Sequence, residues 1–346
     1  MISFRPLQGK LCKLMRCPVP DLLARSEDRW EVAPGSEGYA PPAVFLPEQI
    51  ERIRDTEFAP IDEVVQSFRG GFGTYEGPTV AHRFRYVDLV DGVLYANGYQ
   101  RHLRPRLTRS LTYRRPDETL SGTMYESWVG NRWFGNWLSD DCLTYMLAAA
   151  VGQPVTTAPD PTGHVPHYES LLGMAARRLG DVHFDELVLF EDLANNSGKA
   201  QRAWAMREKL LHGRKIDPLP GVFLLRGKSG DARVLENERQ IAENMAETYG
   251  FKVLDPAHAT VDQIADVCGQ AAIIAGVEGS HLVHGLAMMP PRATLFVIQP
   301  PDRTVAALKI VTDRQDQRYA FVVAEGSRLK FRANWSEIKR TLDLLH

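Results

Sequence analysis

The chain has 346 residues and a formal net charge of −2 at pH 7; 44% of its residues are hydrophobic and 24% are charged. This length is too great for one compact core and predicts two domains, while the ordinary composition excludes wholesale disorder. The lack of a basic excess argues against a nucleic-acid-binding protein. The four cysteines show no paired metal-ligand spacing, which fits a protein of a reducing compartment.

The first residues carry several basic side chains but no apolar run long enough for a signal peptide. Nothing in the chain approaches a membrane span of roughly 20 apolar residues. We therefore expect a cytoplasmic protein, and the sequence leaves open peripheral contact with the inner face of a membrane and a homodimer. Residues 1–40 are dotted with proline, glycine and serine and predict an irregular segment.

Residues 41–216 predict a first α/β domain. Residues 79–100 alternate and are rich in Val, Tyr and Phe around Asp91-Gly92, which is typical of a β-hairpin. Four glycines between residues 69 and 77 could form a phosphate loop, but no apolar strand precedes them, so a turn is the better interpretation. Residues 134–141 open a helix that Ser139 or Asp140 is expected to cap.

Residues 217–330 predict a second domain, entered through the linker Asp217-Pro218-Leu219-Pro220-Gly221. Its apolar strands alternate with helices and are expected at 222–225, 251–254, 271–275 and 294–298. This order is typical of a parallel sheet, in which ligands bind at the carboxyl ends of the strands. Residues 331–346 predict a terminal amphipathic helix that packs back across the domains.

Three familiar motifs are incomplete in this second domain. Gly227-Lys228-Ser229 lacks the earlier glycine of a phosphate-binding P-loop, because Val222 stands there. The turn after Gly276 lacks the second glycine of a dinucleotide fingerprint, and the residues around Ser280 lack the hydrolase elbow.

A glycine-bounded turn from strand into helix remains, at residues 276–285. The backbone N–H groups of Gly279, Ser280 and His281 are expected at the helix start, where they could bind a diphosphate. His281 and His284 share a helix face and could be metal ligands, but no third ligand lies nearby, and core or surface histidines are the simpler interpretation.

Basic residues follow two of the predicted strands. Arg226, Lys228 and Arg233 follow the first strand of this domain, and Arg303 follows the fourth. They could form a solvated patch or contact phosphate groups, whose oxygens suit guanidinium groups.

These segments resemble a known family. The chain reads Arg226…Arg233-x-x-x-Asn237-Glu238, Gly250-Phe251, Asp255-Pro256, Gly276-Val277-Glu278-Gly279-Ser280-His281-Leu282 and Met289-Pro290-Pro291. This pattern is similar to the C-terminal half of glycosyltransferase family 61 (the DUF563 group), in a bacterial variant. The resemblance covers about residues 125–325 and is firmest over 222–300. It implies a GT-B-like α/β fold, with two Rossmann-like domains facing a cleft, a nucleotide-sugar held by the second, and inversion at the anomeric carbon.

Two positions depart from the family pattern. Glu278 and Asn136 stand where the family often has histidine, the latter before Trp137 on the expected acceptor side. We expect transfer from a nucleoside diphosphate sugar, with a UDP-sugar favoured, to a hydroxyl of a glycan or polysaccharide. Asp140 is the first choice for the base that deprotonates this hydroxyl, with capping as its alternative. Glu278 is the second choice, with hydrogen bonding to the ribose or the nucleobase as its alternative.

No D-x-D-like pair follows a strand of the second domain, so we expect no metal and no further cofactor. Two other functions stay open. One is a non-catalytic protein that binds a nucleotide-sugar or glycan, as the missing histidines suggest. The other is a dehydrogenase that uses the same sheet, against which the missing glycine fingerprint argues.

Overall fold

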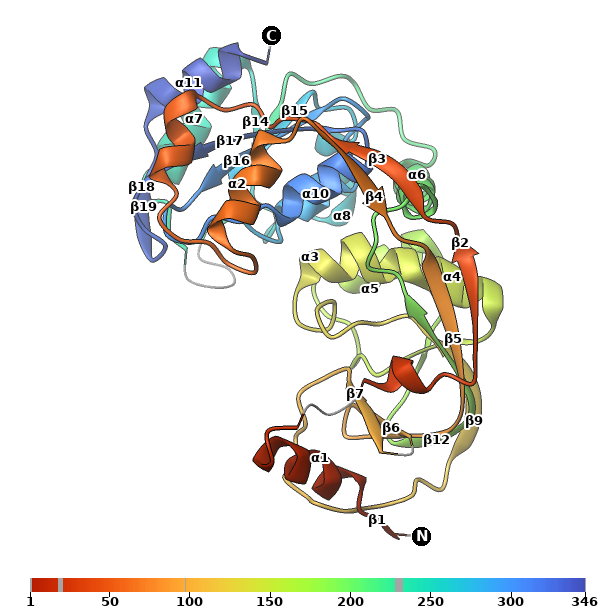
Figure 1. Cartoon of the computed structure of the whole chain (residues 1–346). Coiled ribbons are helices and arrows are strands. Elements are labelled where there is room, and N and C mark those ends of the chain that lie inside the picture. Colours follow the sequence, from red (N-terminus) through yellow and green to blue (C-terminus); the bar gives the residue numbers. More distant parts are fainter. Residues whose placement is uncertain (1, 18–20, 97, 228–232, 346) are drawn as a thin grey trace. The chain divides into compact units, whose positions relative to one another are not determined.

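The computed structural model describes residues 2–17, 21–96, 98–227 and 233–345 (Figure 1). The chain forms two compact units. Unit 1 consists of Met1–Gly35 and Gly77–Ala194, and unit 2 consists of Ser36–Glu76 and Asn195–His346. The expected boundary near residue 217 therefore differs from the observed division, since two earlier segments belong to unit 2.

Unit 1 is built on a mixed eight-stranded sheet. Its strands are β2 (Asp28–Ala33), β5 (Thr79–Val90), β6 (Val93–Ala96), β7 (Tyr99–His102), β9 (Thr119–Met124), β10 (Pro154–Thr156), β11 (Arg177–Arg178) and β12 (Val182–Glu191). Their order is β11-β10-β9-β12-β5-β6-β7, with β2 paired to β5 as well. Strands β9 to β12 run parallel to one another, whereas β2, β5, β6 and β7 pair antiparallel.

The expectation of a Rossmann-like first domain is therefore wrong for unit 1, because only half of its sheet is parallel. The predicted hairpin at residues 79–100 is confirmed, and it accounts for part of the antiparallel half. Asp91 and Gly92 adopt positive φ angles of 51° and 70°, and the chain returns with Val90 opposite Val93. A two-residue turn of this kind matches the twist of the strands it joins.

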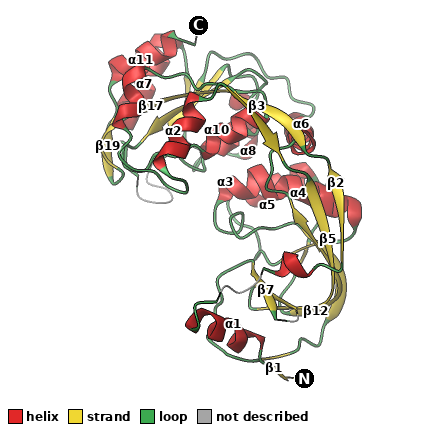
Figure 2. Ribbon diagram, viewed as in Figure 1, coloured by secondary structure: helices red, strands yellow, loops and turns green. Residues whose placement is uncertain are grey.

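The remaining elements of unit 1 are short strands and helices. They are β1 (Ile2–Ser3), which pairs with β8 (Tyr113–Arg114), α1 (Arg5–Leu14), the 3-10 helix η1 (Leu22–Arg25), α3 (Phe134–Asn136), the π-helical turn η3 (Trp137–Asp141), α4 (Cys142–Val151) and α5 (Val165–Leu172). Helix α4 packs on β9 and β10. Figure 2 shows α4 in red beside the yellow strands of unit 1. The first 40 residues are thus not irregular as expected, because α1 forms a helix and β2 joins the main sheet.

Unit 2 contains the predicted parallel sheet. Its strands are β13 (Val222–Leu224), β14 (Lys252–Leu254), β15 (Ile273–Val277), β16 (Thr294–Gln299) and β17 (Arg318–Val323), in the order β14-β13-β15-β16-β17. All five run parallel, and every residue of β15 and β16 is buried, as expected for strands covered on both faces. Numbered along the chain, this order is 2-1-3-4-5, which is the flavodoxin-like order of a doubly wound fold.

The helices of this sheet follow the local sequence signals. They are α7 (Glu238–Tyr249), α8 (Val261–Cys268), α9 (Leu282–Leu286), α10 (Ala307–Arg314) and α11 (Trp335–Asp343). Gly250 ends α7 with a φ of 72°, and Thr260 and Gln263 form the predicted capping box of α8. Helix α11 packs on β17, with Ile338 and Leu342 in the core of unit 2.

Two earlier segments complete unit 2. They supply β3 (Ser36–Ala40), the 3-10 helix η2 (Pro47–Arg52), α2 (Ile61–Arg69), β4 (Phe72–Glu76) and α6 (Ser197–Leu211), and the C-terminal part adds the hairpin β18 (Glu325–Ser327) and β19 (Lys330–Arg332). These segments belong to unit 2 because α2, α6 and β3 all pack on α10. Residues 72–76 of the glycine-rich stretch form a strand paired with β3, neither a phosphate loop nor a turn.

Candidate functional site

Charged residues gather at the carboxyl edge of the unit 2 sheet. Arg226 follows β13, Glu278 follows β15 and Arg303 follows β16. These three strands are neighbours and parallel, so the residues that follow them lie along one edge. This is the edge at which open α/β sheets bind ligands.

The carboxylate of Glu278 lies between two guanidinium groups. Arg233 donates to its Oε2 atom, and Arg303 Nη1 donates to the same oxygen at 2.9 Å. All three side chains are less than a tenth exposed. Two cationic partners stabilise the anionic form of a carboxylate and occupy its lone pairs. The geometry therefore favours Glu278 as an anchor that orients two arginines over its expected role as a base.

Arg303 has further contacts that the sequence did not predict. Its Nε atom lies 3.4 Å from Oε2 of Glu57, and its guanidinium carbon lies 5.6 Å from the ring centre of Phe58. Glu57 also contacts Arg328, at 3.4 Å. Glu57 precedes α2 and is far from the strand ends in the sequence, so no local pattern indicates that it belongs to this edge.

Arg226 crosses the turn that follows β15. Its Nη1 atom donates to the backbone oxygen of Glu278 at 3.3 Å. A Cβ atom at Gly279 would overlap this Nη1 atom, and the φ of Gly279 is 154°, so only glycine suits this position. The absence of a side chain at residue 279 thus lets a guanidinium group lie against the turn.

The main chain next to Arg226 is held by Glu238, the first residue of α7. The N–H groups of Arg226 and Gly227 donate to the two carboxylate oxygens of Glu238 at 2.7 and 3.1 Å. Burial raises the pKa of Glu238, and the two backbone donors act in the opposite direction. The sequence pattern of the family includes Glu238, but no role was predicted for it. Its place in the first turn of a helix was the sequence feature that could have indicated one.

The two histidines differ in exposure. His281 precedes α9 and is partly exposed as a residue, but both of its ring nitrogens are buried, and the whole side chain of His284 is buried. Desolvation lowers the pKa of His281 well below its ordinary value, and the charge of Arg226 adds to this effect. His281 is therefore held as a neutral imidazole beside the arginines.

The sequence predicted that a helix start, together with basic side chains, would supply the positive charge at this edge. Helix α9 has only five residues, so its dipole is weaker than that of a long helix, and the positive charge comes from arginine side chains. Ser280 is partly exposed in the same turn. Lys228 lies outside the described residues. Among the residues that are described, no group of three His, Cys, Asp or Glu side chains could hold a metal ion.

The expected acceptor-side residues lie together in unit 1. Asn136 Nδ2 donates to Asp140 Oδ2 at 3.3 Å, and Ser139 Oγ donates to the same oxygen at 3.1 Å. Trp137 packs against Phe134 and Tyr168, with ring centres 5.8 and 6.3 Å apart. The structure thus joins Asn136, Trp137 and Asp140 in one polar and aromatic cluster.

Asp140 is half-buried and does not cap a helix as expected. It lies inside a continuous helical segment, residues 134–151, which widens into the π-helical turn η3. Such turns occur frequently at functional sites, because they displace side chains from the regular helical positions. The sequence placed Asp140 near a helix start, and in the structure it lies in η3, which directly precedes α4.

The neighbouring Asp141 is buried and has a local partner. Its carboxylate accepts from Ser127 Oγ at 2.7 Å and from the Ser127 N–H at 3.1 Å. Burial raises the pKa of Asp141 well above its ordinary value. A Cβ atom at Gly130 would overlap this carboxylate, so Asp141 packs closely on the turn of residues 127–130.

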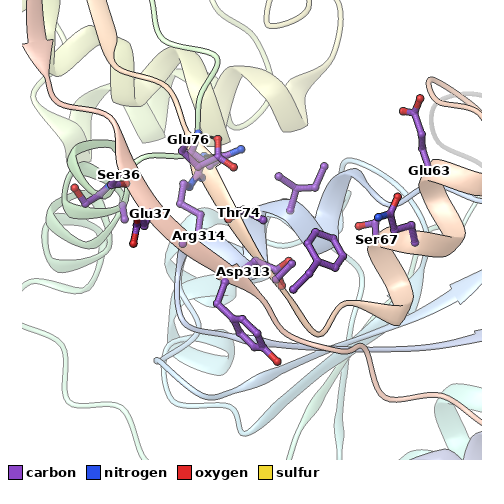
Figure 3. Close-up of a pocket in the computed structure, with 17 residues that line it drawn as sticks. Ser36, Glu37, Glu63, Ser67, Thr74, Glu76, Asp313 and Arg314 are labelled. Carbon is purple, nitrogen blue, oxygen red and sulfur yellow. Dashed lines mark hydrogen bonds between the residues drawn. The ribbon is translucent and has the colours of Figure 1, made fainter.

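A pocket of about 440 Å³ lies elsewhere in unit 2, and none of its 17 lining residues was singled out from the sequence (Figure 3). Figure 3 shows it between the antiparallel strand pair β3 and β4, α2 and α10. The charged residues that line it are Glu37, Glu63, Glu76, Asp313 and Arg314. Four carboxylates against one guanidinium group repel anions, so the pocket does not suit a diphosphate.

A doubly wound parallel sheet with buried arginines at its carboxyl edge defines unit 2 as an α/β unit suited to an anionic ligand. The family model Glycosyltransferase 61 matches residues 40–296, well over half of the chain. The protein therefore belongs to the glycosyltransferase 61 family.

Solved structures give weaker similarities. The E. coli heptosyltransferase WaaC with ADP matches at 14% identity and a TM-score of 0.28, covering 41% of this chain and 49% of that one. The aligned part thus spans about half of that protein. A glucose dehydrogenase from Haloferax mediterranei matches at 12% identity and a TM-score of 0.20, over 42% and 45% of the two chains. No sequence among curated proteins matches significantly.

Proposed function

We propose that the protein transfers a sugar from a nucleoside diphosphate sugar, with UDP as the favoured nucleotide, to a hydroxyl of a glycan or polysaccharide. We further propose that the transfer inverts the anomeric carbon and needs no metal. The observation that carries this proposal is the gathering of Arg226, Arg233 and Arg303 at the carboxyl edge of unit 2, in a chain of the glycosyltransferase 61 family.

The donor is assigned to unit 2, where the arginines would bind the diphosphate. As the bond from the anomeric carbon to the diphosphate breaks, the leaving group takes the electron pair and gains negative charge. Guanidinium groups that are already oriented stabilise this charge without reorganisation. Each charge-assisted hydrogen bond contributes about 1.5–3 kcal/mol. Glu278 holds Arg233 and Arg303 in position before the donor arrives.

The acceptor is assigned to unit 1, with Asp140 as the base. In this step the acceptor oxygen forms a bond to the anomeric carbon from the face opposite the diphosphate, and Asp140 takes the hydroxyl proton. Asn136 and Ser139 hold one carboxylate oxygen, which fixes the orientation of the group. Trp137 offers an aromatic surface beside it, which suits the apolar face of a sugar ring.

Donor binding is tested by thermal shift with UDP, ADP, GDP and UDP-sugars. Stabilisation follows RT ln(1 + [L]/Kd), so even weak ligands register at high concentration. Arg226→Gln should weaken nucleotide binding at least about tenfold, the equivalent of one charge-assisted bond. Arg340→Gln, an exposed residue of α11, is the matched control and should bind like the wild type. A shift with none of these nucleotides would overturn the proposal.

Catalysis is tested by substitution of Asp140. Asp140→Asn should abolish sugar transfer and leave the nucleotide-induced shift intact, because the base touches the acceptor and not the donor. Asp141→Asn changes the adjacent buried acid in the same way and should retain transfer. Full turnover by Asp140→Asn would remove this residue from the mechanism.

A second candidate is a protein that binds a nucleotide-sugar or glycan without catalysis. It is favoured by Glu278, which replaces a histidine of the family pattern and is engaged by Arg233 and Arg303. Slow hydrolysis of a bound donor would favour the enzyme. Tight donor binding without hydrolysis or transfer to any glycan would favour the binding protein.

A further inference from the structure

Helix α1 presents its apolar side to solvent. Backbone hydrogen bonds extend its helical turns from Phe4 to Met15, since Gln8 N–H donates to Phe4 and Met15 N–H to Leu11. At 3.6 residues per turn, the five apolar side chains of this stretch fall within an arc of about 100°. They are Phe4, Leu7, Leu11, Leu14 and Met15. All but the half-buried Leu7 are exposed, and Leu14 is 80% exposed.

The opposite side of α1 packs on the rest of unit 1. Pro6 and Gly9 are its buried residues, and a Cβ atom at Gly9 would lie 2.8 Å from Gln100 Oε1. Arg5 anchors the helix start through Asp88, at 2.9 Å. The helix is thus fixed with its small residues inward and its large apolar residues outward, the reverse of an ordinary amphipathic surface helix.

The exposed apolar surface continues onto an adjoining loop. The N–H of Leu7 donates to the backbone oxygen of Leu111 at 3.0 Å, and Ile2 pairs with Arg114. Leu107 in this loop is 93% exposed, and Leu111 and Ile2 are exposed as well. We call α1 with its flanking residues and the loop of residues 101–116 the basic apolar surface.

This surface is positively charged, although the whole chain carries a formal charge of −2. The described residues 2–17 contain four Lys or Arg and no Asp or Glu, and residues 101–116 contain six and none. Five of these ten basic residues form ion pairs with acids of unit 1, namely Arg5, Arg101, Arg106, Arg114 and Arg115. Lys10, Arg16 and Arg109 have no ion pair within the described part of the chain, and all three are exposed.

We propose that the basic apolar surface docks on a lipid bilayer that contains anionic phospholipids. An apolar stripe with basic side chains nearby that are not paired with acids is the composition that binds at the boundary of headgroups and acyl chains. Lys10 borders the stripe next to Leu14 on the helical wheel, and Arg16 directly follows Met15, so both are close enough to the stripe to meet lipid phosphates. None of the described helices is long and apolar enough to cross a membrane.

Charge favours a bilayer over a second copy of the chain. A two-fold interface sets the same patch of two subunits against itself, which would bring Lys10, Arg16 and Arg109 of both copies together without an acid of this surface to pair with them. An anionic bilayer supplies the complementary charge and an apolar phase for Leu11 and Leu14 at the same time.

The test is co-sedimentation of the full-length protein with vesicles. Vesicles of phosphatidylcholine mixed with phosphatidylglycerol should bind the protein, those of phosphatidylcholine alone should bind it much less, and added salt should weaken the binding. Leu11→Gln/Leu14→Gln should reduce partitioning at least about tenfold, because two apolar side chains lose their burial. Lys10→Glu/Arg16→Glu should reduce it about fivefold for each unit of charge removed.

Matched controls lie outside the surface. Leu193→Gln changes a leucine of unit 1 that is 78% exposed, and Lys339→Glu changes an exposed lysine of unit 2. Both should bind vesicles like the wild type. All substituted side chains are exposed, so the variants should keep the wild-type melting temperature. None of the substituted residues is proposed to contact the donor or the acceptor. The nucleotide-induced thermal shift should therefore stay unchanged in these variants, so a failure of membrane binding can be told apart from a failure of the proposed function.

The proposal is overturned if the wild type does not bind anionic vesicles, or if the Leu11→Gln/Leu14→Gln variant binds them as well as the wild type does. It is also overturned if light scattering finds a dimer that this variant dissociates while vesicles capture no protein. In that case the basic apolar surface joins two copies of the chain.

Discussion

Glu278 of unit 2 and Asp141 of unit 1 are both buried carboxylates, yet the two units stabilise them in opposite ways. Glu278 is engaged by the guanidinium groups of Arg233 and Arg303, whereas Asp141 accepts from the N–H and hydroxyl of Ser127. Cationic partners favour the ionised acid, but neutral donors do not offset burial, which raises the pKa of Asp141. The first acid organises a charged edge, and the second fixes a local turn.

The largest effect is expected where a buried charge loses its partner. Glu278→Gln leaves the buried Arg233 and Arg303 without their shared carboxylate, which should lower the free energy of unfolding by about 3–5 kcal/mol. Chemical denaturation, with amide exchange of β15 to assign the loss to unit 2, measures it. Glu247→Gln, at an exposed position of α7, is the control and should change stability little. A loss below about 1 kcal/mol would show that the two arginines do not depend on Glu278.

A smaller loss of stability is expected when a methyl group is placed against the buried carboxylate of Asp141. Gly130→Ala places a methyl group on the Asp141 carboxylate and should cost about 1–3 kcal/mol, because the turn has to shift. Gly180→Ala is the matched control, since nothing lies within 4 Å of a Cβ atom there. Adding Asp141→Ala should relieve part of the Gly130→Ala cost; strict additivity of the two changes would contradict the close packing.

Asp141→Asn should cost about 1 kcal/mol through its hydrogen bonds, and its pH dependence distinguishes the two kinds of acid. With a raised pKa, the folded state keeps a proton that the unfolded state releases above its pKa of about 3.9. The contribution of Asp141 is thus fully present at low pH and is lost as the pH rises toward the folded pKa. The difference in stability between the wild type and Asp141→Asn should fall between pH 4 and pH 7, measured by urea denaturation. A difference that rises with pH would contradict the raised pKa.

The smallest effect is expected for an ion pair at the surface. Glu118 and Arg177 of unit 1 form such a pair, with both side chains about half exposed. Glu118→Gln should change the free energy of unfolding by less than about 0.5 kcal/mol, because water and salt screen the pair. If Glu118→Gln lowered the free energy of unfolding as much as Glu278→Gln does, the loss at Glu278 would come from the broken ion pair and not from burial.

The sequence predicted unit 2 more closely than unit 1, and the reason is the range of the contacts. Each crossover of a parallel sheet joins neighbouring segments, so strand, helix, cap and C-terminal glycine leave local signals, as at Gly250 and Thr260. In unit 1, Asp28 pairs with Arg83, and β9 pairs with β12 across two intervening strands. Such pairings depend on loops and packing that leave no short pattern.

By itself, the sequence determined which residues follow the strands of unit 2, because parallel strands bring Arg226, Glu278 and Arg303 to one edge whatever their loops do. Only the tertiary structure decided that Glu278 is engaged by two arginines and that Glu57 joins them from a distant segment. It also decided that α1 turns its apolar side to solvent, because helical periodicity defines the faces of a helix but not which one is buried.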